Sequence, residues 1–438
     1  MLYFSTNRNS EPVSLKEAVI GGLAADGGLY MPVQLPTIPA SQFDMVADHS
    51  FSETAYDVAL EFFRDDIPGR VILDIVEDSF DFPLPLNEVK QGIFSMELYH
   101  GPTLAFKDIG ARFMSRLMSW LYRNEERELN VVVATSGDTG SAVAAGFHNV
   151  EGINVFILFP RAKVSPLQQK QITTWGDNIH AIEVDGSFDD CQKLAKQLLA
   201  DRELNNTLSV TSANSINIGR LIPQTFYYFY AFSQLKGLRV PVVFSVPSGN
   251  FGNITGGIMA MFSGLPVKRF IASININDVF KKFLESGIYK AEKSIETLSN
   301  AMDVGDPSNF ARLNEMMGGK SAMFRKYMSA YSFTDQATLE GIDKVYRDTG
   351  YIMDPHGAVA FLGAEQFLEE QDEPANVVFL ETAHPAKFRE TINRVIKDYA
   401  GLPPQLKAVV DKKEKYHSAG NDIDEIRSFI GEINRISM

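Results

Sequence analysis

Short apolar runs alternate with segments of helical pattern along most of the chain after Asn130. In the first half, the runs VVVAT, VFILFP and IHAIEV are each followed by a segment of helical spacing, namely SAVAAGFHN, SPLQQKQITTW and FDDCQKLAKQLLA. Continuous apolar strands separated by helices are typical of parallel sheets that are buried on both faces. The pattern therefore predicts an α/β fold.

The alternation returns in the second half of the chain. The helical RLIPQTFYYFYAFSQL, the strand VPVVFSV, the helical ITGGIMAMFS and the strand KRFIASIN follow one another. After a less regular stretch, 278–330, we expect a helix over Thr334–Asp348, followed by the apolar stretch HGAVAFLGAEQFL, a strand in VVFLET and a closing helix that ends near Tyr399. These two regions predict two doubly wound α/β domains, over residues 93–205 and 206–400.

The two ends of the chain differ from this pattern. Residues 1–92 contain helical stretches, Leu15–Ala24 and Thr54–Phe63, a proline-rich connector, MPVQLPTIP, and no convincing chemical cluster. They predict a small, α-rich N-terminal appendage. Residues 401–438 are charged and polar apart from the amphipathic IDEIRSFIGEINRI. We expect them to form a C-terminal tail that packs back on the body.

Composition narrows the class of protein. At 438 residues the chain is long for one core, so two or three domains are expected. An apolar content of 45% and a charged content of 22% are typical of a globular protein. No apolar run is long enough to span a bilayer, and MLYFSTNRNSEP becomes polar too early for a signal peptide. The net charge of −14 argues against nucleic-acid binding, and a site for an anion must then create its own positive field.

The single cysteine, Cys191, excludes an intrachain disulfide. It lies in the helical pattern FDDCQKLAKQLLA, so we interpret it as a buried small residue rather than a nucleophile. Its isolation fits a reducing compartment, which predicts a cytoplasmic protein. No coiled-coil heptad is present, and we expect a monomer rather than a dimer, with a small-molecule substrate and without a metal, membrane or nucleic-acid partner.

A lysine in the stretch HGPTLAFKD is the first candidate for chemistry. Lys107 follows apolar and small residues and precedes a helical segment, Ile109–Arg123. Desolvation disfavours an ammonium, so the pKa of such a lysine falls and its neutral amine becomes a nucleophile towards aldehydes. For a lone lysine the alternative is a side chain that snorkels at a helix start.

A glycine-containing stretch, PSGNFGN, connects the strand VPVVFSV to a helix. Gly249 and Gly252 permit positive φ and close backbone approach, so that consecutive N–H groups point into one concavity. The positive end of the helix dipole adds to this, which predicts a cradle for a small phosphate. The loop contains neither GxxxxGK(S/T) nor GxGxxG, which argues against a P-loop or a dinucleotide fold. The alternative is a plain strand–helix turn with an asparagine cap.

Two further polar stretches follow predicted strands. Thr135–Gly140, TSGDTG, gathers hydroxyls, amides and one carboxylate at a helix N-terminus, which suits a carboxylate or phosphate of a bound substrate. A simple Ser/Asp helix cap is the alternative. In Glu381–Phe388, ETAHPAKF, the hydroxyl of Thr382 can face a heterocyclic nitrogen, and here too the alternative is a cap.

Together, HGPTLAFKD, SGDTGSA, PSGNFGN and ETAHPAKF closely resemble the threonine synthase family of pyridoxal-phosphate enzymes, in the tryptophan-synthase-β-like group. The match is ordered along the chain, spans about residues 1–400 and includes YFSTN near the start. The threonine and serine dehydratases usually carry a serine-rich segment near the lysine and an SSGN-like loop, whereas this chain has GPTLAFKD and SGDTG. The resemblance implies fold type II, with pyridoxal 5'-phosphate in a cleft between two α/β domains and the lysine at the edge of the first.

The resemblance also implies roles for individual residues. Lys107 matches the lysine that holds pyridoxal phosphate as a Schiff base and acts as general base and acid. Thr382 matches the residue that faces the pyridine nitrogen, where a hydroxyl leaves that nitrogen largely unprotonated. The residues that match the loop around the cofactor phosphate are Gly249, Asn250, Phe251, Gly252 and Asn253.

Substrate contacts are implied in two segments. The residues that match the segment contacting the substrate are Ser136, Gly137, Asp138 and Thr139. Those similar to the binding segment for the substrate phosphate are Asn214, Ser215 and Arg220. Read from the residues alone, an arginine at a helix start can form a bidentate pair with phosphate, which agrees with this role. Weaker candidates are Arg161 and Lys163, which surface charge also explains, and His356 and His384, which packing or capping also explains.

The reaction implied is the conversion of O-phospho-L-homoserine and water to L-threonine and phosphate, a γ-elimination followed by a β-addition in threonine biosynthesis. Two alternatives stay open. A pyridoxal-phosphate-dependent threonine/serine dehydratase or phospho-lyase would use the same lysine and phosphate loop, although a dehydratase needs no second phosphate site. The other alternative is a catalytically inactive homologue. Sequence changes after a loss of activity should have altered at least one of the motifs around Lys107, SGDTG and GNFGN, and all three are intact.

Overall fold

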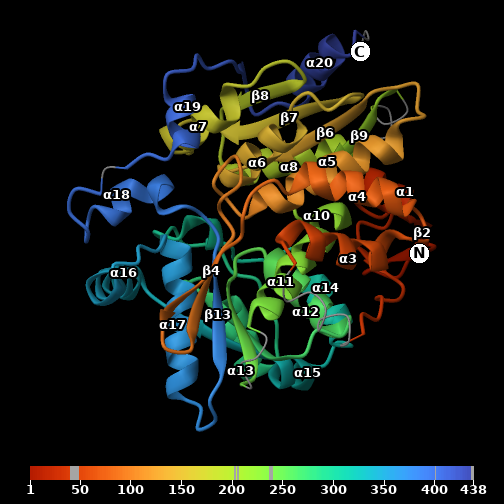
Figure 1. Cartoon of the computed structure of the whole chain (residues 1–438). Helices are drawn as coiled ribbons and strands as arrows, with labels where there is room; N and C mark the ends of the chain where they lie inside the picture. Colours follow the sequence, from red (N-terminus) through yellow and green to blue (C-terminus); the bar gives the residue numbers. More distant parts are fainter. Residues whose placement is uncertain (40–48, 202–203, 205–206, 236–239, 400, 436–438) are drawn as a thin grey trace. The chain divides into compact units, whose positions relative to one another are not determined.

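The computed structural model describes residues 1–39, 49–201, 204, 207–235, 240–399 and 401–435 (Figure 1). Contacts within the chain separate two compact units. One, here called the lysine unit, comprises residues 2–30, 107–220 and 402–438. The other, here called the glycine-loop unit because it contains PSGNFGN, comprises Met1 with residues 31–106 and 221–401.

The lysine unit is built on a parallel sheet. Among the described residues this sheet has five strands in the order β14-β8-β7-β6-β9. The strands are β6 Leu129–Ala134, β7 Ile153–Pro160, β8 Ile179–Val184, β9 Ser209–Ser212 and β14 His417–Ala419. Every residue of β6 and β7 is buried, as expected of central strands that are covered on both faces. The prediction of buried parallel strands is therefore confirmed here.

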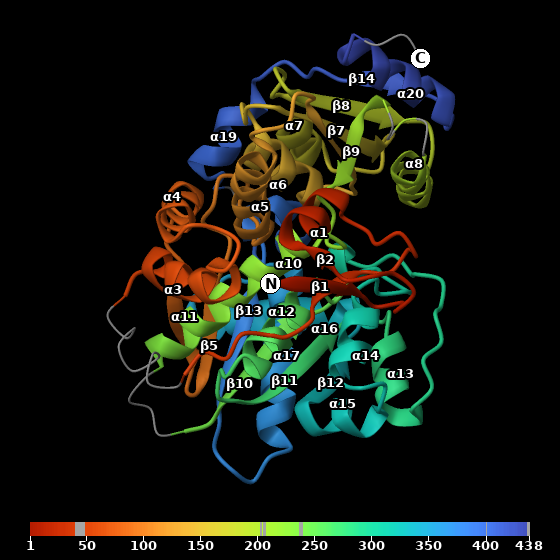
Figure 2. The same ribbon diagram turned by 90° about the vertical axis from the view of Figure 1, so that its right-hand side faces the viewer.

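Helices cover both faces of this sheet (Figure 2). On one face α8 and α20 share a core with Phe156, and Cys191 of α8 lies in that core. Cys191 is fully buried, as predicted, and burial raises the pKa of its thiol to about 12. On the other face lies α6, because a Cβ at Gly140 would be 3.1 Å from Ile157, which points away from Phe156. The helices are α1 Leu15–Gly21, α5 Lys107–Tyr122, α6 Asp138–Phe147, α7 Pro166–Thr173, α8 Phe188–Ala200, α10 Ile218–Leu221, α19 Pro404–Val410 and α20 Ile423–Ile433.

The glycine-loop unit has a mixed sheet. Its described strands follow the order β12-β11-β10-β13-β5-β4, and all neighbours are parallel except β4 and β5, which pair antiparallel. The strands are β4 Leu86–Lys90, β5 Ile93–Glu97, β10 Val242–Pro247, β11 Val267–Ile274, β12 Met328–Ser332 and β13 Asn376–Glu381. All residues of β10 and β13 are buried, so the second region of alternating strands and helices also forms buried parallel strands.

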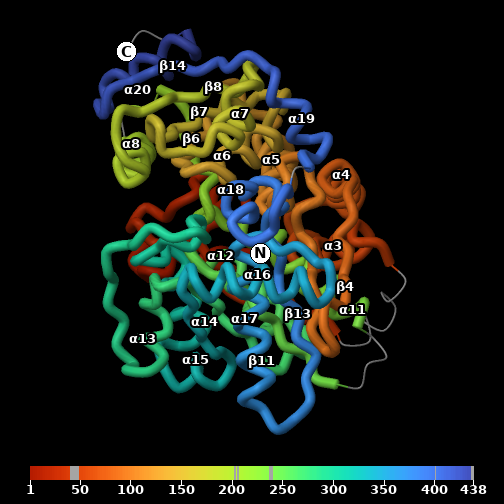
Figure 3. The backbone as a smooth tube through the Cα atoms, turned by 90° about the vertical axis from the view of Figure 1, so that its left-hand side faces the viewer, coloured from red at the N-terminus to blue at the C-terminus, as the bar shows by residue number. Residues whose placement is uncertain are grey.

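The helix α17 packs closely on this sheet (Figure 3). A Cβ at Gly363 would lie 2.0 Å from Ser273 Oγ, and Ser245 Oγ donates to the carbonyl of Ala360 at 2.6 Å. A second helix, α12, meets the sheet through Gly257, where a Cβ would be 2.3 Å from the ring of Phe270. The helices are α3 Phe51–Phe63, α4 Gly69–Ser79, η2 Ile222–Thr225, α11 Phe226–Gln234, α12 Gly252–Phe262, α13 Val279–Ser286, η3 Asn300–Met302, α14 Phe310–Met316, α15 Ser321–Tyr327, α16 Asp335–Thr349, α17 Pro355–Glu369, η4 Pro385–Phe388 and α18 Arg389–Ile392.

The compact units divide the chain differently from the four ranges predicted from the sequence. The strand β5 pairs with β13, and β9 pairs with β6, so each joins the sheet opposite to the one expected. Residues 1–92 are shared between both units rather than forming one block. Local patterns carry no information on which distant strand becomes a neighbour. The breakpoints at residues 205, 206 and 400 lie outside the described residues, and the four ranges stay a prediction about independently folding parts.

Several elements had not been expected. The N-terminal segment adds the strands β1 Leu2–Ser5, β2 Val13–Ser14 and β3 Tyr30–Pro32. The prediction of a closing helix that ends near Tyr399 is wrong, because the structure has only the short helices η4 and α18, which end before Asn393. Among the described residues no helix is both long enough and apolar enough to cross a membrane.

Candidate active site

Lys107 is the first residue of α5. The segment before it runs antiparallel to the segment after β13. Phe106 N donates to the carbonyl of Thr382 at 2.9 Å, His384 N donates to the carbonyl of Leu104 at 3.1 Å, and Ala105 pairs with Ala383. Leu104 itself has φ 59, a left-handed conformation that costs a leucine on the order of 1 kcal/mol or more. The backbone leading into the lysine is therefore held by three consecutive residues.

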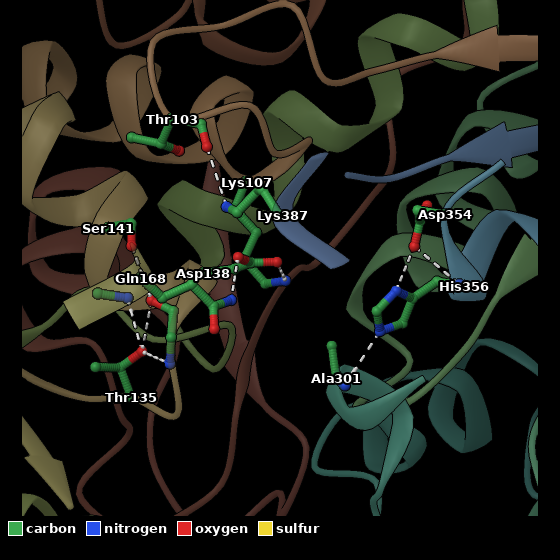
Figure 4. Close-up of polar contacts among 12 residues, drawn as sticks. Thr103, Lys107, Thr135, Asp138, Ser141, Gln168, Ala301, Asp354, His356 and Lys387 are labelled. Atoms are coloured by element: carbon green, nitrogen blue, oxygen red, sulfur yellow. Dashed lines mark hydrogen bonds and ion pairs between the residues drawn. The ribbon is translucent and has the colours of Figure 1, made fainter. Parts of the chain in front are cut away.

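The amine of Lys107 lies 3.9 Å from Asp138 Oδ2 (Figure 4). Both side chains are largely buried, at 18% and 7% exposure. Asp138 is the first residue of α6, and its other oxygen, Oδ1, accepts a hydrogen bond from Gln168 Nε2 at 2.8 Å. The predicted substrate segment thus presents a carboxylate that is already oriented towards the lysine.

The turn before α6 is organised by a threonine. Thr135 Oγ1 accepts from the backbone N–H groups of Gly137 and Gly140, at 2.9 and 2.8 Å. Gly137 has φ 148, and a Cβ there would lie 2.7 Å from the amide of Gln168, so only glycine fits. The helix N-cap is Gly137 and carries no side-chain cap, while Ser136 is exposed. The alternative of a simple Ser/Asp cap is therefore wrong.

The proposed residues for the substrate phosphate lie just after β9. Arg220 is only 4% exposed, and its Nη1 donates to the carbonyl of Ala213 at 2.7 Å. Burial lowers the pKa of the Arg220 guanidinium to about 10, against the attraction of Asp108, which raises it. The amide of Asn214 pairs with the backbone of Ala134 at the end of β6, donating at 2.9 Å and accepting at 3.3 Å. Ser215 is half-buried.

The PSGNFGN stretch forms a tight corner between β10 and α12. A Cβ at Gly249 would lie 2.6 Å from the carbonyl oxygen of Ala301 and 2.8 Å from Met302 Cα, so this backbone contact requires glycine. Phe251 takes the left-handed conformation with φ 61, and its ring packs 4.7 Å from that of Phe280. Phe251 is the N-cap of α12 and provides no side-chain cap, so the asparagine-cap alternative is wrong. The first N–H groups of α12 gain no side-chain acceptor at the cap.

Asn253, in the first turn of α12, carries an unsatisfied donor. Its Oδ1 accepts from the hydroxyls of Tyr227 and Tyr228 at 2.5 and 2.7 Å. Its buried Nδ2 has no hydrogen-bond partner among the described residues. An amide N–H₂ left without an acceptor costs about 1–3 kcal/mol when buried, unless an acceptor arrives from outside the chain. A donor of this kind at the positive end of a helix fits a phosphate.

Thr382 directly follows β13. The residue is 7% exposed and its carbonyl is taken by Phe106, while its hydroxyl has no hydrogen-bond partner within the part of the chain that the structure describes. His384 caps η4, since its Nδ1 accepts from Ala386 N at 3.1 Å, and burial lowers the pKa of its imidazole to about 4. For this histidine the capping interpretation is the one that the structure supports. Thr382 does not cap.

The remaining candidates from the sequence are two surface cations and one buried histidine. Arg161 is exposed and pairs with Glu183 at 3.1 Å and with Asp185 at 3.4 Å, which is a surface ion pair. Lys163 is exposed as well. His356 is almost fully buried and contacts Asp354 and Ala301.

Comparisons with known proteins agree with this set of features. A model for pyridoxal-phosphate dependent enzymes matches residues 82–383, one for the threonine synthase N terminus matches residues 2–80, and one for the threonine synthase C-terminal region matches residues 357–430. A threonine synthase of Serratia marcescens is 38% identical over 431 residues, which is 98% of this chain and 99% of that relative. The chain belongs to the threonine synthase family of pyridoxal-phosphate-dependent enzymes.

Solved structures of the family have the same fold. The crystal structure of threonine synthase from Escherichia coli matches with a TM-score of 0.91 at 37% identity, covering 99% of this chain and all of that one. A structure of threonine synthase with bound pyridoxal phosphate from Brucella melitensis matches with a TM-score of 0.93 at 34% identity, with the same coverage. The predicted fold type II is therefore confirmed, and so is the prediction of a pyridoxal-phosphate enzyme.

Sequence reasoning missed several polar residues around these positions. Gln168, which orients Asp138, stands in the helical stretch SPLQQKQ, where a glutamine reads as an exposed position. Asp354 and Glu381, both fully buried, flank a helix start and a strand end. The dipeptide Asp354–Pro355 was a usable signal for a helix N-cap. Nothing in the sequence indicated that His356 would contact Ala301, because that contact joins distant segments.

Proposed function

We propose that this protein converts O-phospho-L-homoserine and water to L-threonine and phosphate, as a pyridoxal-phosphate-dependent lyase of threonine biosynthesis. The observation that carries the proposal is the pairing of Lys107 with Asp138 at 3.9 Å, within the two motifs that the family resemblance singles out. A match over almost the whole length to threonine synthases supports the same reaction.

Taken unit by unit, the residues present suit the groups of the cofactor. The amine of Lys107 would hold the aldehyde, and the hydroxyl of Thr382 would donate a hydrogen bond to the ring nitrogen. The phosphate would be held by Asn253 Nδ2 and by backbone N–H groups of Gly249–Gly252, where a donor lacks an acceptor. When bound, pyridoxal phosphate supplies an electron sink for the carbanions that elimination and addition require. A neutral hydroxyl at its ring nitrogen keeps that sink weaker than a carboxylate would.

Proton movement falls to Lys107. Its amine would take the proton from the substrate Cα, hold it at Nζ, and deliver protons during the later steps at Cβ and Cγ. Asp138 would stabilise the ammonium whenever Nζ carries the proton, since its Oδ2 faces the amine and Gln168 holds its Oδ1. The turn formed by Ser136, Gly137 and Thr139 would contact the substrate beside this carboxylate.

The leaving phosphate is assigned to Asn214, Ser215 and Arg220. In support, Arg220 is a buried cation, and a buried guanidinium gains strongly from a bidentate anion. Nη1 of Arg220 and the amide of Asn214 also bind backbone groups, which hold both side chains in place beside the end of β6.

A direct assay tests the proposal. The purified protein, supplied with pyridoxal phosphate, should release equal amounts of phosphate and threonine from O-phosphohomoserine. Production of ketoacid from threonine should be far slower, because threonine offers nothing to the phosphate contacts. If threonine were turned over faster than phosphohomoserine, the protein would be a dehydratase and the proposal would be wrong.

We propose further that the protein acts in the cytoplasm as a monomer. A single buried cysteine suits a reducing compartment, since it needs no oxidising partner. Light scattering during size-exclusion chromatography measures the assembly state, and a mass of twice 48.7 kDa would contradict the monomer.

A further inference from the structure

A buried chain of polar contacts links the start of α17 to the turn that covers Gly249. Asp354 is the N-cap of α17, and its carboxylate accepts from His356 N at 2.8 Å and from Gly357 N at 3.3 Å. His356 Nδ1 lies 2.5 Å from Asp354 Oδ1, and Ala301 N donates to His356 Nε2 at 3.2 Å (Figure 4). Asp354 and His356 are 0% and 2% exposed.

These contacts fix the tautomer of His356. A backbone N–H is always a donor, so Nε2 must be the unprotonated nitrogen that accepts from Ala301. The ring proton therefore sits on Nδ1, which donates a hydrogen bond to Asp354. Edge contact with the ring of Phe388, at a centroid distance of 5.0 Å, holds the imidazole from the side. The imidazole is locked with its acceptor directed at Ala301.

Ala301 is in turn in close contact with the predicted phosphate loop. Its carbonyl oxygen lies where a Cβ at Gly249 would be only 2.6 Å away, so the two backbones touch. The N–H of the same residue is the group that His356 binds. Movement at position 301 would therefore be transmitted to Gly249, and from there to the N-terminus of α12.

A second carboxyl group closes this network on the other side. Glu381, the residue before Thr382, is fully buried, and a Cβ at Gly357 would lie 2.1 Å from its Oε1. Burial and then repulsion from Asp354 raise the pKa of Glu381 well above its usual range, which favours its protonated form. Burial opposes the ionisation of Asp354, but the hydrogen bonds that its carboxylate accepts outweigh burial, and its pKa falls. Of the two carboxyl groups, Asp354 is therefore the one that favours the ionised form.

We propose that His356 is a positioning residue for the cofactor phosphate, which holds the Ala301 turn against Gly249 and so keeps the 249–253 loop in its binding conformation. Asp354 supplies the orientation of its ring. This inference rests on the proposed role of the loop in binding the phosphate of pyridoxal phosphate. It assigns to His356 a role that needs no contact with the substrate.

Comparison of two ligands separates positioning from general stability. Pyridoxal phosphate uses both Lys107 and the loop, whereas pyridoxal, which has no phosphate, uses Lys107 without the loop. His356→Leu keeps the volume of the ring but removes the acceptor. Its dissociation constant for pyridoxal phosphate should rise about tenfold, while that for pyridoxal should change less than about twofold. His356→Gln places an amide oxygen near the position of Nε2 and should restore most of the preference.

A matched control and a direct structural measurement complete the experiment. His180→Leu removes a half-buried histidine of β8 in the lysine unit and should leave both dissociation constants unchanged. Hydrogen exchange of peptides that cover Ala301 should be faster in His356→Leu than in the parent without any ligand. Equal weakening of both ligands, or an unchanged preference, would overturn the inference. Binding is measured without substrate, so a failure to form threonine would count against the proposed function alone.

Discussion

Gln168 Nε2 donates to Asp138 Oδ1, which leaves the second carboxylate oxygen of Asp138 facing the amine of Lys107. A glutamine from α7 thereby sets the direction of a carboxylate on α6. The same amide lies against Gly137, where no side chain would fit. Gln168 therefore determines both the shape of the turn and the orientation of its charge.

Gln168→Leu should lower turnover of phosphohomoserine about 10- to 100-fold, because a buried carboxylate oxygen that loses its donor costs about 1–3 kcal/mol. Cofactor binding, followed by absorbance, should persist. Gln169→Leu is the matched control, since the neighbouring glutamine binds Glu414 instead. Similar rates for the two variants would show that Gln168 has no special part in orienting Asp138.

Reconstituted protein should be yellow, and borohydride should fix the cofactor irreversibly to Lys107. The reason is that only a lysine amine joined to the aldehyde becomes a stable secondary amine on reduction. Peptide mass spectrometry locates the adduct. Lys107→Ala should give no adduct under the same conditions, and an adduct elsewhere in the parent would remove Lys107 from its assigned role.

Arg220→Met should lower kcat/KM for phosphohomoserine. The lost transition-state stabilisation should be about 2–5 kcal/mol, because a buried bidentate contact with phosphate is removed. Binding of an unphosphorylated amino acid, followed by the spectrum of the bound cofactor, should change much less. Thermal unfolding of the variant reports the loss of the Arg220–Ala213 hydrogen bond separately. Equal losses for both ligands would make Arg220 a purely structural residue.

Thr382→Val should retain the cofactor and lower turnover about tenfold, since the side chain keeps its shape while losing its donor. Thr382→Asp should raise the proton affinity of the ring nitrogen, because a carboxylate favours the pyridinium. We therefore expect Thr382→Asp to shift the cofactor spectrum, to form threonine more slowly and to undergo more abortive transamination. Parent-like spectra and products in both variants would leave Thr382 without a role at the ring.

The free energy of unfolding should depend on pH through the protonation of His384. Its pKa is about 4 in the folded state, below the unfolded value of about 6.5, so the unfolded state binds more protons between these values. The stability that this group contributes is therefore complete above about pH 6.5 and is lost as pH falls towards 4. Between pH 7.5 and pH 5 the parent should lose up to about 2 kcal/mol more than His384→Asn, which keeps an acceptor for Ala386 but does not titrate. Urea unfolding measures this, and parallel pH profiles would contradict it.

Much of the site was predictable because it depends on local chemistry. A lysine at a helix start and a glycine corner between strand and helix are properties of a few neighbouring residues, and Lys107 and Gly249 lie where the sequence indicated. Gln168 and Glu381 were not predictable, because each acquires its role from a contact with a distant segment, whereas the N-cap role of Asp354 was signalled by the proline that follows it. The burial of Arg220 could not be predicted for the same reason, since the sequence around one arginine among polar residues indicates an exposed side chain.

The strand assignments show the same limit on a larger scale. The buried runs of β6, β7, β8, β10, β11 and β13 were recognised as strands from their own residues, whereas β9 and β12 were not predicted as strands. The neighbours of a strand depend on pairing across the chain, and β5 and β9 joined sheets other than those expected. Short polar-edged elements such as β4 and α4 lack the continuous apolar signal on which the prediction relied.

The pairing of Ile93 with Val377 has a consequence for how the protein is made. On the ribosome β5 emerges early, yet the strand that flanks it in parallel, β13, emerges only when synthesis is nearly complete. Until then β5 has only the β4 hairpin as a partner, and its other edge stays open to wrong pairing. Contacts this distant in sequence also slow folding, because loop closure must precede them. Folding of the glycine-loop unit should therefore be the slow step of maturation, and a truncated chain that lacks β13 should need a chaperone to stay in solution.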